Sequence, residues 1–151
     1  LREMADGYRA ATAIGSPGKP ASYRQKRDGV DETVEGAADR IEFDGRAICY
    51  ITDTEHFEGR RDATVTTLAR GADVMIYDCT YTDAEYHSRV GWGHSTWQEC
   101  LRIAKDAGVK TPVIFHHDPT RDDDMLDQLA KDAEAAFPGA VVAREGLTIS
   151  V

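Results

Sequence analysis

Short apolar runs alternate with amphipathic stretches through most of this chain. Trp97, Leu101 and Ala104 recur at spacings of four and three, which places them on one face of a helix. The apolar run from Pro112 to Phe115 has the length typical of a buried strand. Similar patterns predict, in chain order, a strand hairpin over 41–51, a helix over 62–70, a strand over 74–77, a loop or single helical turn over 82–90, a helix beginning after Thr96, a strand over 112–115, a helix over 122–136, and a hairpin of 141–142 with 147–151 through Glu145-Gly146. This alternation predicts an α/β fold built in layers.

Residue types at the ends of these elements support the boundaries. Asp44-Gly45 is the strongest short signal for a two-residue hairpin turn. Thr96 and Glu99 match the S/T-x-x-E capping box, in which each side chain bonds a backbone N–H of the first helical turn. Gly108 suits the left-handed position just after a helix, and Phe137-Pro138-Gly139 ends the last helix.

The first 35 residues differ from the rest of the chain. Met4 to Ile14 has the pattern of a helix, and Gly15 to Pro20 is a cluster of helix breakers. Ser22 to Glu35 is charged and has almost no large apolar side chains, so little buried surface offsets the entropy of ordering it. We therefore predict a divergent, flexible N-terminal segment over 1–35 and an ordered domain over 36–151.

Composition narrows the class of protein. A chain of 151 residues is long enough for one core and too short for two comfortable domains. No run approaches the ~18 apolar residues that span a bilayer, and no secretory leader is visible, so a cytoplasmic location without membrane contact is expected. The net charge of −9 makes a nucleic-acid partner unlikely. Cys49, Cys79 and Cys100 are odd in number and far apart, which predicts reduced structural thiols.

Carboxylates and imidazoles stand where the predicted elements end. Asp53 follows the first hairpin, Asp78 ends the strand 74–77, and His116 follows the strand 112–115. His94 stands at the entry to the next helix. Open α/β architectures usually place their chemistry at the carboxyl ends of strands. Because aspartate and histidine suit zinc, manganese or iron, these residues predict a metal and acid–base site.

A purely structural role is the alternative for each of these residues. Either aspartate could cap the segment that follows it, and His94 could flank a helix. Ser95 is disfavoured as a nucleophile, because the sequence has no G-x-S-x-G elbow. His56 could approach the same metal or lie exposed in a loop, and His117 would point to the opposite face of its strand. The roles of both histidines stay open.

Four short motifs follow one another in an ordered series: Tyr50-Ile-Thr-Asp-Thr54, Val74 to Tyr81, Gly93-His-Ser-Thr96, and Val113-Ile-Phe-His116 with Pro119. In this order they resemble the metallo-β-lactamase-fold hydrolases, close to the tRNase Z and phosphodiesterase-like branches. The resemblance covers residues 40–151. It implies the C-terminal half of an αββα sandwich, with a mixed β-sheet and flanking helices.

The resemblance also implies roles for the four residues at the ends of elements. Asp53 would bridge two metal ions, and His116 would bind the second of them. His94 would be the active-site histidine that aids proton transfer, and Asp78 would take the place of an acidic residue that orients such a histidine. The implied cofactor is a dinuclear divalent metal, zinc before manganese or iron.

The chain departs from the family in its metal-binding motifs. The family's H-x-H-x-D-H motif is absent from the sequence, and residues 30–36 lack the histidine that normally precedes the Asp-Thr motif. The expected function is hydrolysis of a phosphodiester or related ester by metal-bound hydroxide, incomplete in this chain alone. The alternative is a non-catalytic interaction module that covers its exposed half-sheet by forming a homodimer. Processing of tRNA ranks below both, because of the net charge of −9.

Overall fold

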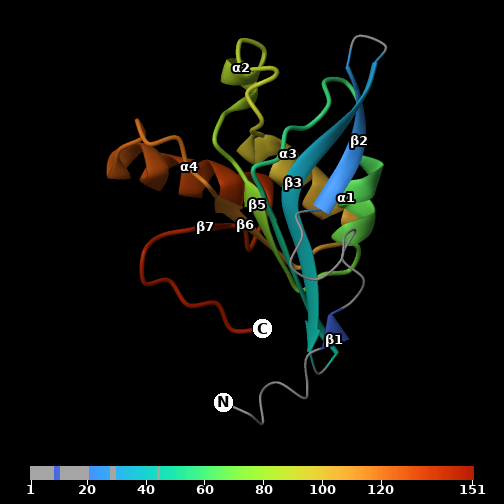
Figure 1. Ribbon diagram of the computed structural model, residues 1–151. Helices are drawn as coiled ribbons and strands as arrows, with labels where there is room; N and C mark the ends of the chain where they lie inside the picture. Colours follow the sequence, from blue (N-terminus) through green and yellow to red (C-terminus); the bar gives the residue numbers. More distant parts are fainter. Residues whose placement is uncertain (1–8, 11–20, 28–29, 44) are drawn as a thin grey trace.

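A mixed β-sheet with helices packed on it organises the computed structural model of the chain (Figure 1), which describes residues 9–10, 21–27, 30–43 and 45–151. The strands are β1 (Arg9–Ala10), β2 (Ala21–Arg27), β3 (Val30–Phe43), β4 (Arg46–Thr52), β5 (Val74–Asp78), β6 (Thr111–Phe115) and β7 (Val141–Val142). The helices are α1 (Ala63–Leu68), α2 (Asp83–Tyr86), α3 (Trp97–Ala107) and α4 (Asp123–Ala136). The predicted α/β class is confirmed.

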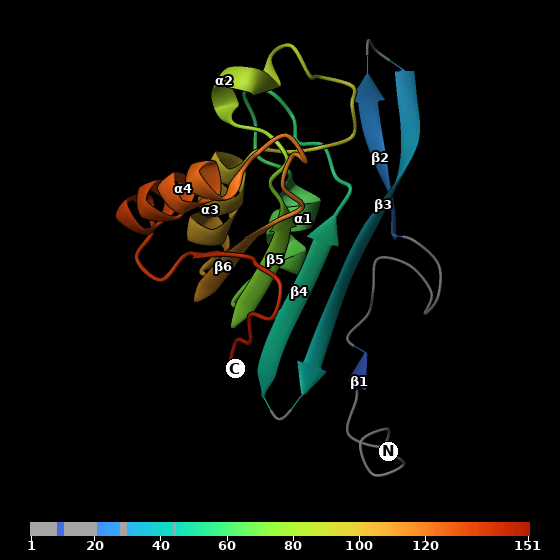
Figure 2. The same cartoon turned by 90° about the vertical axis from the view of Figure 1, so that its left-hand side faces the viewer.

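Strand direction explains how the sheet gathers its carboxyl ends at one edge. The strand order is β1-β3-β4-β5-β6-β7, and β2 pairs with β3 outside this path. β3 and β4 are antiparallel with Phe43 opposite Arg46, so the hairpin turns at the predicted place. β4, β5, β6 and β7 run parallel, and α1, α3 and α4 return the chain between them. The carboxyl ends of β4, β5 and β6 therefore lie together (Figure 2).

The helices cover one face of the sheet. Along β4, Ala47, Cys49 and Ile51 are buried in a core shared with α1, α3 and α4, as the alternation of side chains along a strand requires. The other face is more open, with Tyr50 exposed to 40% and Ile41 to 38%. All three cysteines are free and buried, as predicted. Among the helices of the described ranges, none has the length and apolarity needed to cross a membrane.

Helix α3 begins and ends where the sequence predicts, but its capping box is only half formed. The Thr96 hydroxyl accepts a hydrogen bond from the Glu99 backbone N–H at 3.1 Å, and Gly108 ends the helix with a φ of +69°. The Glu99 carboxylate instead accepts hydrogen bonds from Arg61 and Arg102. A complete capping box starts α2, which is the single helical turn expected within 82–90.

The N-terminal region differs from its prediction. A helix is predicted over Met4 to Ile14, but Arg9–Ala10 is a strand that pairs with β3. The other residues of that predicted helix lie outside the described residues. Ser22 to Glu35, expected to be irregular, lies largely in β2 and β3, which pair from Ala21 with Gly36 to Arg27 with Val30. Backbone pairing of this kind does not require apolar side chains. β3 crosses the proposed domain boundary after residue 35, and that division stays a prediction.

The C-terminal hairpin prediction is wrong. Val141 and Val142 pair in parallel with Val113 and Ile114 of β6, and residues 147–151 form no strand. The Ala143 N–H extends this pairing with a hydrogen bond of 2.9 Å to the Ile114 carbonyl oxygen. Val141–Val142 therefore pairs with the edge of β6, whereas the sequence pattern predicts pairing with residues 147–151.

Candidate metal centre

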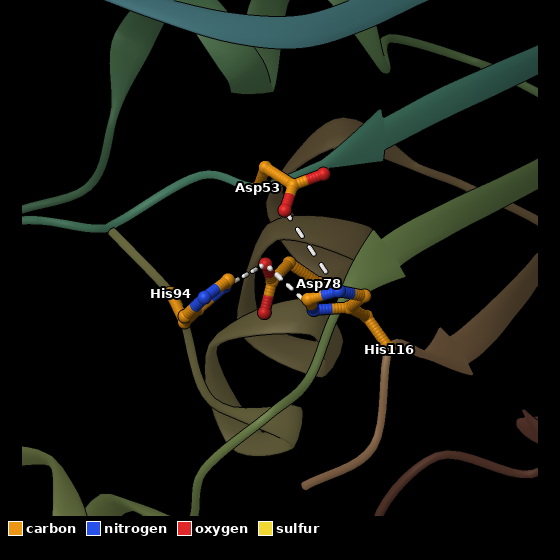
Figure 3. A group of neighbouring side chains, drawn as sticks. All are labelled: Asp53, Asp78, His94 and His116. Carbon is orange, nitrogen blue, oxygen red and sulfur yellow. Dashed lines mark hydrogen bonds and ion pairs between the residues drawn. The ribbon is translucent and has the colours of Figure 1, made fainter. Parts of the chain in front are cut away.

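The four residues singled out in the sequence converge at the carboxyl edge of the sheet (Figure 3). Asp53, Asp78, His94 and His116 each offer a ligand atom, and these atoms all lie within 4.8 Å of one another. Parallel strands make this convergence possible, because Asp53 follows β4, Asp78 ends β5 and His116 follows β6. His94 joins them because the Tyr81–Thr96 bridge brings the segment before α3 beside the end of β5.

Two of these residues have an uncommon backbone conformation. Asp53 has a φ of +49° and His116 a φ of +59°, the only non-glycine residues of the described ranges with positive φ. The left-handed region is sparsely populated by residues with a Cβ, and such strain gathers at functional sites. The turn it produces carries each side chain out of the strand direction and toward the shared edge.

Asp78 is the buried centre of the group. Its Oδ1 accepts hydrogen bonds from the Thr80 N–H at 3.2 Å, the Thr80 hydroxyl at 2.9 Å and the Ser95 N–H at 3.2 Å. Its Oδ2 lies 2.9 Å from His94 Nδ1 and 3.5 Å from His116 Nδ1. Asp78 is fully buried, so it orients both imidazole rings from behind.

The outward-facing atoms suit a divalent cation. His116 Nε2 lies 3.8 Å from Asp53 Oδ1, and both side chains reach solvent. Because a carboxylate accepts hydrogen bonds and does not donate them, the hydrogen of His94 lies on Nδ1 and its Nε2 can accept. The rings of His94 and His116 are 4.9 Å apart between centroids. One carboxylate and imidazoles fixed by a carboxylate are the donors that zinc, manganese and iron take in proteins.

Comparison with known proteins identifies the family. A family model described as "Beta-lactamase superfamily domain" matches residues 9–117, more than half of the chain. The chain belongs to the β-lactamase superfamily. The match begins at residue 9, well upstream of residue 40, where the resemblance stated from the sequence begins.

Curated relatives with similar sequences support the ribonuclease Z-like branch of the superfamily. "Ribonuclease Z" of Brevibacillus brevis is 33% identical over 111 residues, which cover 71% of this chain and 33% of the relative. "Ribonuclease Z" of Thermoplasma volcanium is 34% identical over 116 residues, covering 76% of this chain and 34% of the relative. The chain thus spans about a third of the length of these relatives.

Solved structures confirm the predicted fold class. The metallo-β-lactamase fold protein YhfI from Bacillus subtilis has a TM-score of 0.60 and 22% identity, covering 88% of this chain and 53% of YhfI. The short form of human tRNase Z has a TM-score of 0.56 and 22% identity, covering 85% of this chain and 41% of that protein. At this identity the likeness concerns the fold alone, a mixed sheet with flanking helices.

His56 and His117, the two histidines with open roles, lie outside the candidate metal group. His56 is buried, stacks on Tyr86 at 3.9 Å between ring centroids, and has its Nδ1 2.7 Å from the Ser95 hydroxyl oxygen. His117 places Nε2 3.1 Å from the Ala143 carbonyl oxygen. Burial lowers the pKa of both imidazoles. His56 is therefore neither an exposed loop residue nor a member of the metal group, and Ser95 is engaged as its hydrogen-bond partner.

Two further residues of the site were not singled out in the sequence. The Thr80 hydroxyl oxygen lies 3.1 Å from His116 Nδ1 and 2.9 Å from the His116 carbonyl oxygen. An Asp-x-Thr sequence after a strand, as in Asp78 to Thr80, favours such local hydrogen bonds and offered a weak signal. Glu55 is buried beside the segment that carries His94, and no sequence pattern marked it.

Proposed function

We propose that this chain supplies part of a divalent-metal site that hydrolyses phosphodiesters of RNA. The observation that carries the proposal is the meeting of Asp53, His94 and His116 over the buried Asp78, with ligand atoms within 4.8 Å of one another. The relatives named ribonuclease Z support RNA as the substrate. Their names also argue against the sequence-based expectation that nucleic acid is an unlikely partner, since net charge describes a whole chain and not its active site.

The proposed roles follow from the direction of each side chain. Asp53 and His116 would hold the cation through the carboxylate and Nε2. A divalent cation, with zinc as our first choice, polarises a phosphoryl group and lowers the pKa of a coordinated water. In its doubly protonated form, His94 would give the proton on Nε2 to the leaving oxygen while Asp78 keeps Nδ1–H in place. His94 then needs to lie within hydrogen-bond reach of the substrate.

A cavity beside His116 offers room for the substrate. Its volume is about 720 Å³, within the range of small-ligand pockets. The residues that line it are Phe115, His116, His117, Asp123, Leu126, Ala143, Arg144 and Glu145. Because His116 belongs to both the cavity and the candidate metal group, a ligand in this cavity would lie next to the cation.

Metal content of the purified chain tests the proposal. We expect the chain to bind about one equivalent of zinc, manganese or iron. The affinity should be modest, because catalytic sites usually have at least three protein ligands and only two, Asp53 and His116, are proposed here. Elemental analysis of protein purified without chelator should show this metal, and Asp53→Asn or His116→Gln should remove it. Glu58→Ala, an exposed carboxylate in the segment after Asp53, is the matched control.

Two outcomes would contradict the metal site. Less than about a tenth of an equivalent in the parent chain, also after metal has been supplied in excess, would do so, because even a site of modest affinity fills at saturating metal. Metal that survives both ligand substitutions would mean that it binds elsewhere. If metal is bound as proposed, hydrolysis of an RNA phosphodiester by the chain is the next measurement, and loss in His94→Gln with metal retained would support the proton-transfer role.

A non-catalytic homodimer is the second candidate, because Ile41 and Tyr50 expose apolar surface on the sheet face away from the helices. Sedimentation equilibrium distinguishes it from the metal site. A metal-free dimer that dissociates when Tyr50→Lys is introduced would favour the interaction module, and a monomer that binds metal would exclude it.

A further inference from the structure

The backbone just before His94 is held by one buried carboxylate, that of Glu55. Its Oε1 accepts the Gly91 N–H at 2.5 Å, and its Oε2 accepts the Gly93 N–H at 2.9 Å. The Tyr86 hydroxyl lies 3.5 Å from the same Oε1. Glu55 is only 7% exposed, so these contacts take place away from bulk water, where charge-assisted hydrogen bonds are strong.

The two glycines allow the backbone to reach this carboxylate. Gly91 has a φ of +90° and Gly93 a φ of +83°, a region that a residue with a Cβ enters at a cost. With both N–H groups directed at Glu55, the intervening Trp92 is left 59% exposed. The next residue along the chain is His94, whose ring turns inward to Asp78 at 2.9 Å.

Glu55 therefore connects two parts of the candidate metal centre. It lies two residues after Asp53, and its carboxylate fixes the residue directly before His94. We propose that Glu55 is a positioning residue that sets the direction of the His94 ring against Asp78. The inference rests on the proposed function for its catalytic meaning, but the geometry it concerns exists without metal or substrate.

A purely structural role makes a different prediction. If Glu55 only stabilised the fold, its loss would lower the melting temperature and leave the folded protein with an unchanged His94–Asp78 hydrogen bond. A positioning role requires that bond to change in protein that is still folded. Nuclear magnetic resonance of the His94 Nδ1–H, measured with chelator present, separates the two roles, and His94→Gln assigns the signal.

The test compares Glu55→Ala and Glu55→Gln with Glu58→Ala as the control. In Glu55→Ala we expect the His94 Nδ1–H signal to be lost or to move to the position of a free imidazole. The Gly91 and Gly93 amides should exchange with solvent at least about tenfold faster, because each loses the partner that protects it. Glu55→Gln has one oxygen and one NH₂ group, so it should protect one of the two amides and give an intermediate signal.

Three results would overturn the proposal. One is an unchanged His94 signal in folded Glu55→Ala, and another is an equal change in Glu58→Ala. The third is Glu55→Gln behaving as Glu55→Ala at both glycine amides, because the amide oxygen should rescue one of them. A failure of the parent chain to bind metal would end the proposed function and leave this measurement intact.

Discussion

Glu99 and Asp78 are two of the buried carboxylates of this molecule, and their hydrogen-bond partners differ in kind. Glu99, at the start of α3, is 2% exposed and accepts hydrogen bonds of 2.6 and 2.7 Å from Arg61 and of 2.7 Å from Arg102. The two guanidinium groups are also bound by Asp106 and Asp83. Arginine stays charged at any physiological pH, so the charge of the two guanidinium groups in this cluster does not change.

Asp78 is just as buried, but some of its partners can still bind a proton or a cation. Its partners are Thr80, Ser95 and the two imidazoles of His94 and His116, each of which turns one nitrogen away from Asp78. An imidazole can take or release a proton or bind a cation through that second nitrogen. The comparison indicates that charge saturated by arginines holds α3 in place, whereas charge shared with histidines can support chemistry.

The largest effect on stability is expected from Glu99→Ala. Removing one partner of a buried ion pair usually costs about 3–5 kcal/mol. The cost should be smaller here, because Arg61 and Arg102 are about a third exposed and keep other partners. We therefore expect a loss of about 2–3 kcal/mol in the free energy of unfolding, measured by urea denaturation. Metal affinity should stay within about twofold, and a larger loss would mean that the two carboxylates are not independent.

Asp78→Asn should give the reverse pattern. The amide keeps the size of the side chain but no longer offers His94 and His116 a charged acceptor. Loss of a carboxylate that orients metal-binding imidazoles typically weakens metal binding about 10–100-fold, or about 1.4–2.7 kcal/mol. Calorimetric titration with zinc measures this change, and Asp83→Asn, an exposed aspartate, is the control. Unchanged zinc affinity with a large drop in stability would make Asp78 a structural residue like Glu99.

The Asp78 half of this contrast is visible in the sequence, because strand ends and periodicity are local features. Asp53, Asp78 and His116 were found from their places after short apolar runs, and the parallel sheet then brought them together. Their roles stay predictions until the ligand variants are measured. The helix over 122–136 was found in the same way, and it starts at Asp123 with Asp122 as its cap.

The missed features depend on contacts between distant parts of the chain. Glu55 meets Gly91 and Gly93 across 36 and 38 positions, and no pattern of nearby residues signals such a meeting. The sequence predicts the strand at Val141–Val142 but not its partner, because the choice between β6 and the chain end depends on the whole sheet. The sequence pattern predicts a capping box with Glu99, but in the structure Arg61 and Arg102 bind its carboxylate.

A smaller effect is expected from Thr80→Val. The hydroxyl donates to Asp78 Oδ1 at 2.9 Å and lies 3.1 Å from His116 Nδ1, and valine has nearly the same shape without these contacts. A hydrogen bond of this kind contributes about 1 kcal/mol, so zinc affinity should fall about fivefold. Thr80→Ser keeps the hydroxyl and should stay near the parent value. Equal losses in both variants would assign the effect to packing of the methyl group.

The smallest effect concerns His56, a buried histidine near both carboxylates. Its Nδ1 is 2.7 Å from the Ser95 hydroxyl oxygen, and it lines a cavity with Glu99 and Arg102. Burial lowers the pKa of His56, and the positive charge of Arg102 lowers it further. The negative charges of Glu99, Asp83 and Glu55 act in the opposite direction.

A histidine with a lowered pKa in the folded state binds its proton more readily when unfolded. The stability that neutral His56 contributes is therefore complete above the unfolded pKa of about 6.5 and is lost as the pH falls through the folded value. Between about pH 7.5 and about pH 5, the melting temperature of the parent should fall more than that of His56→Asn. His117 has the same direction of shift and is present in both proteins, so the difference isolates His56. Equal decreases in the two proteins would mean that the pKa of His56 is the same in the folded and the unfolded protein, and that burial does not shift it.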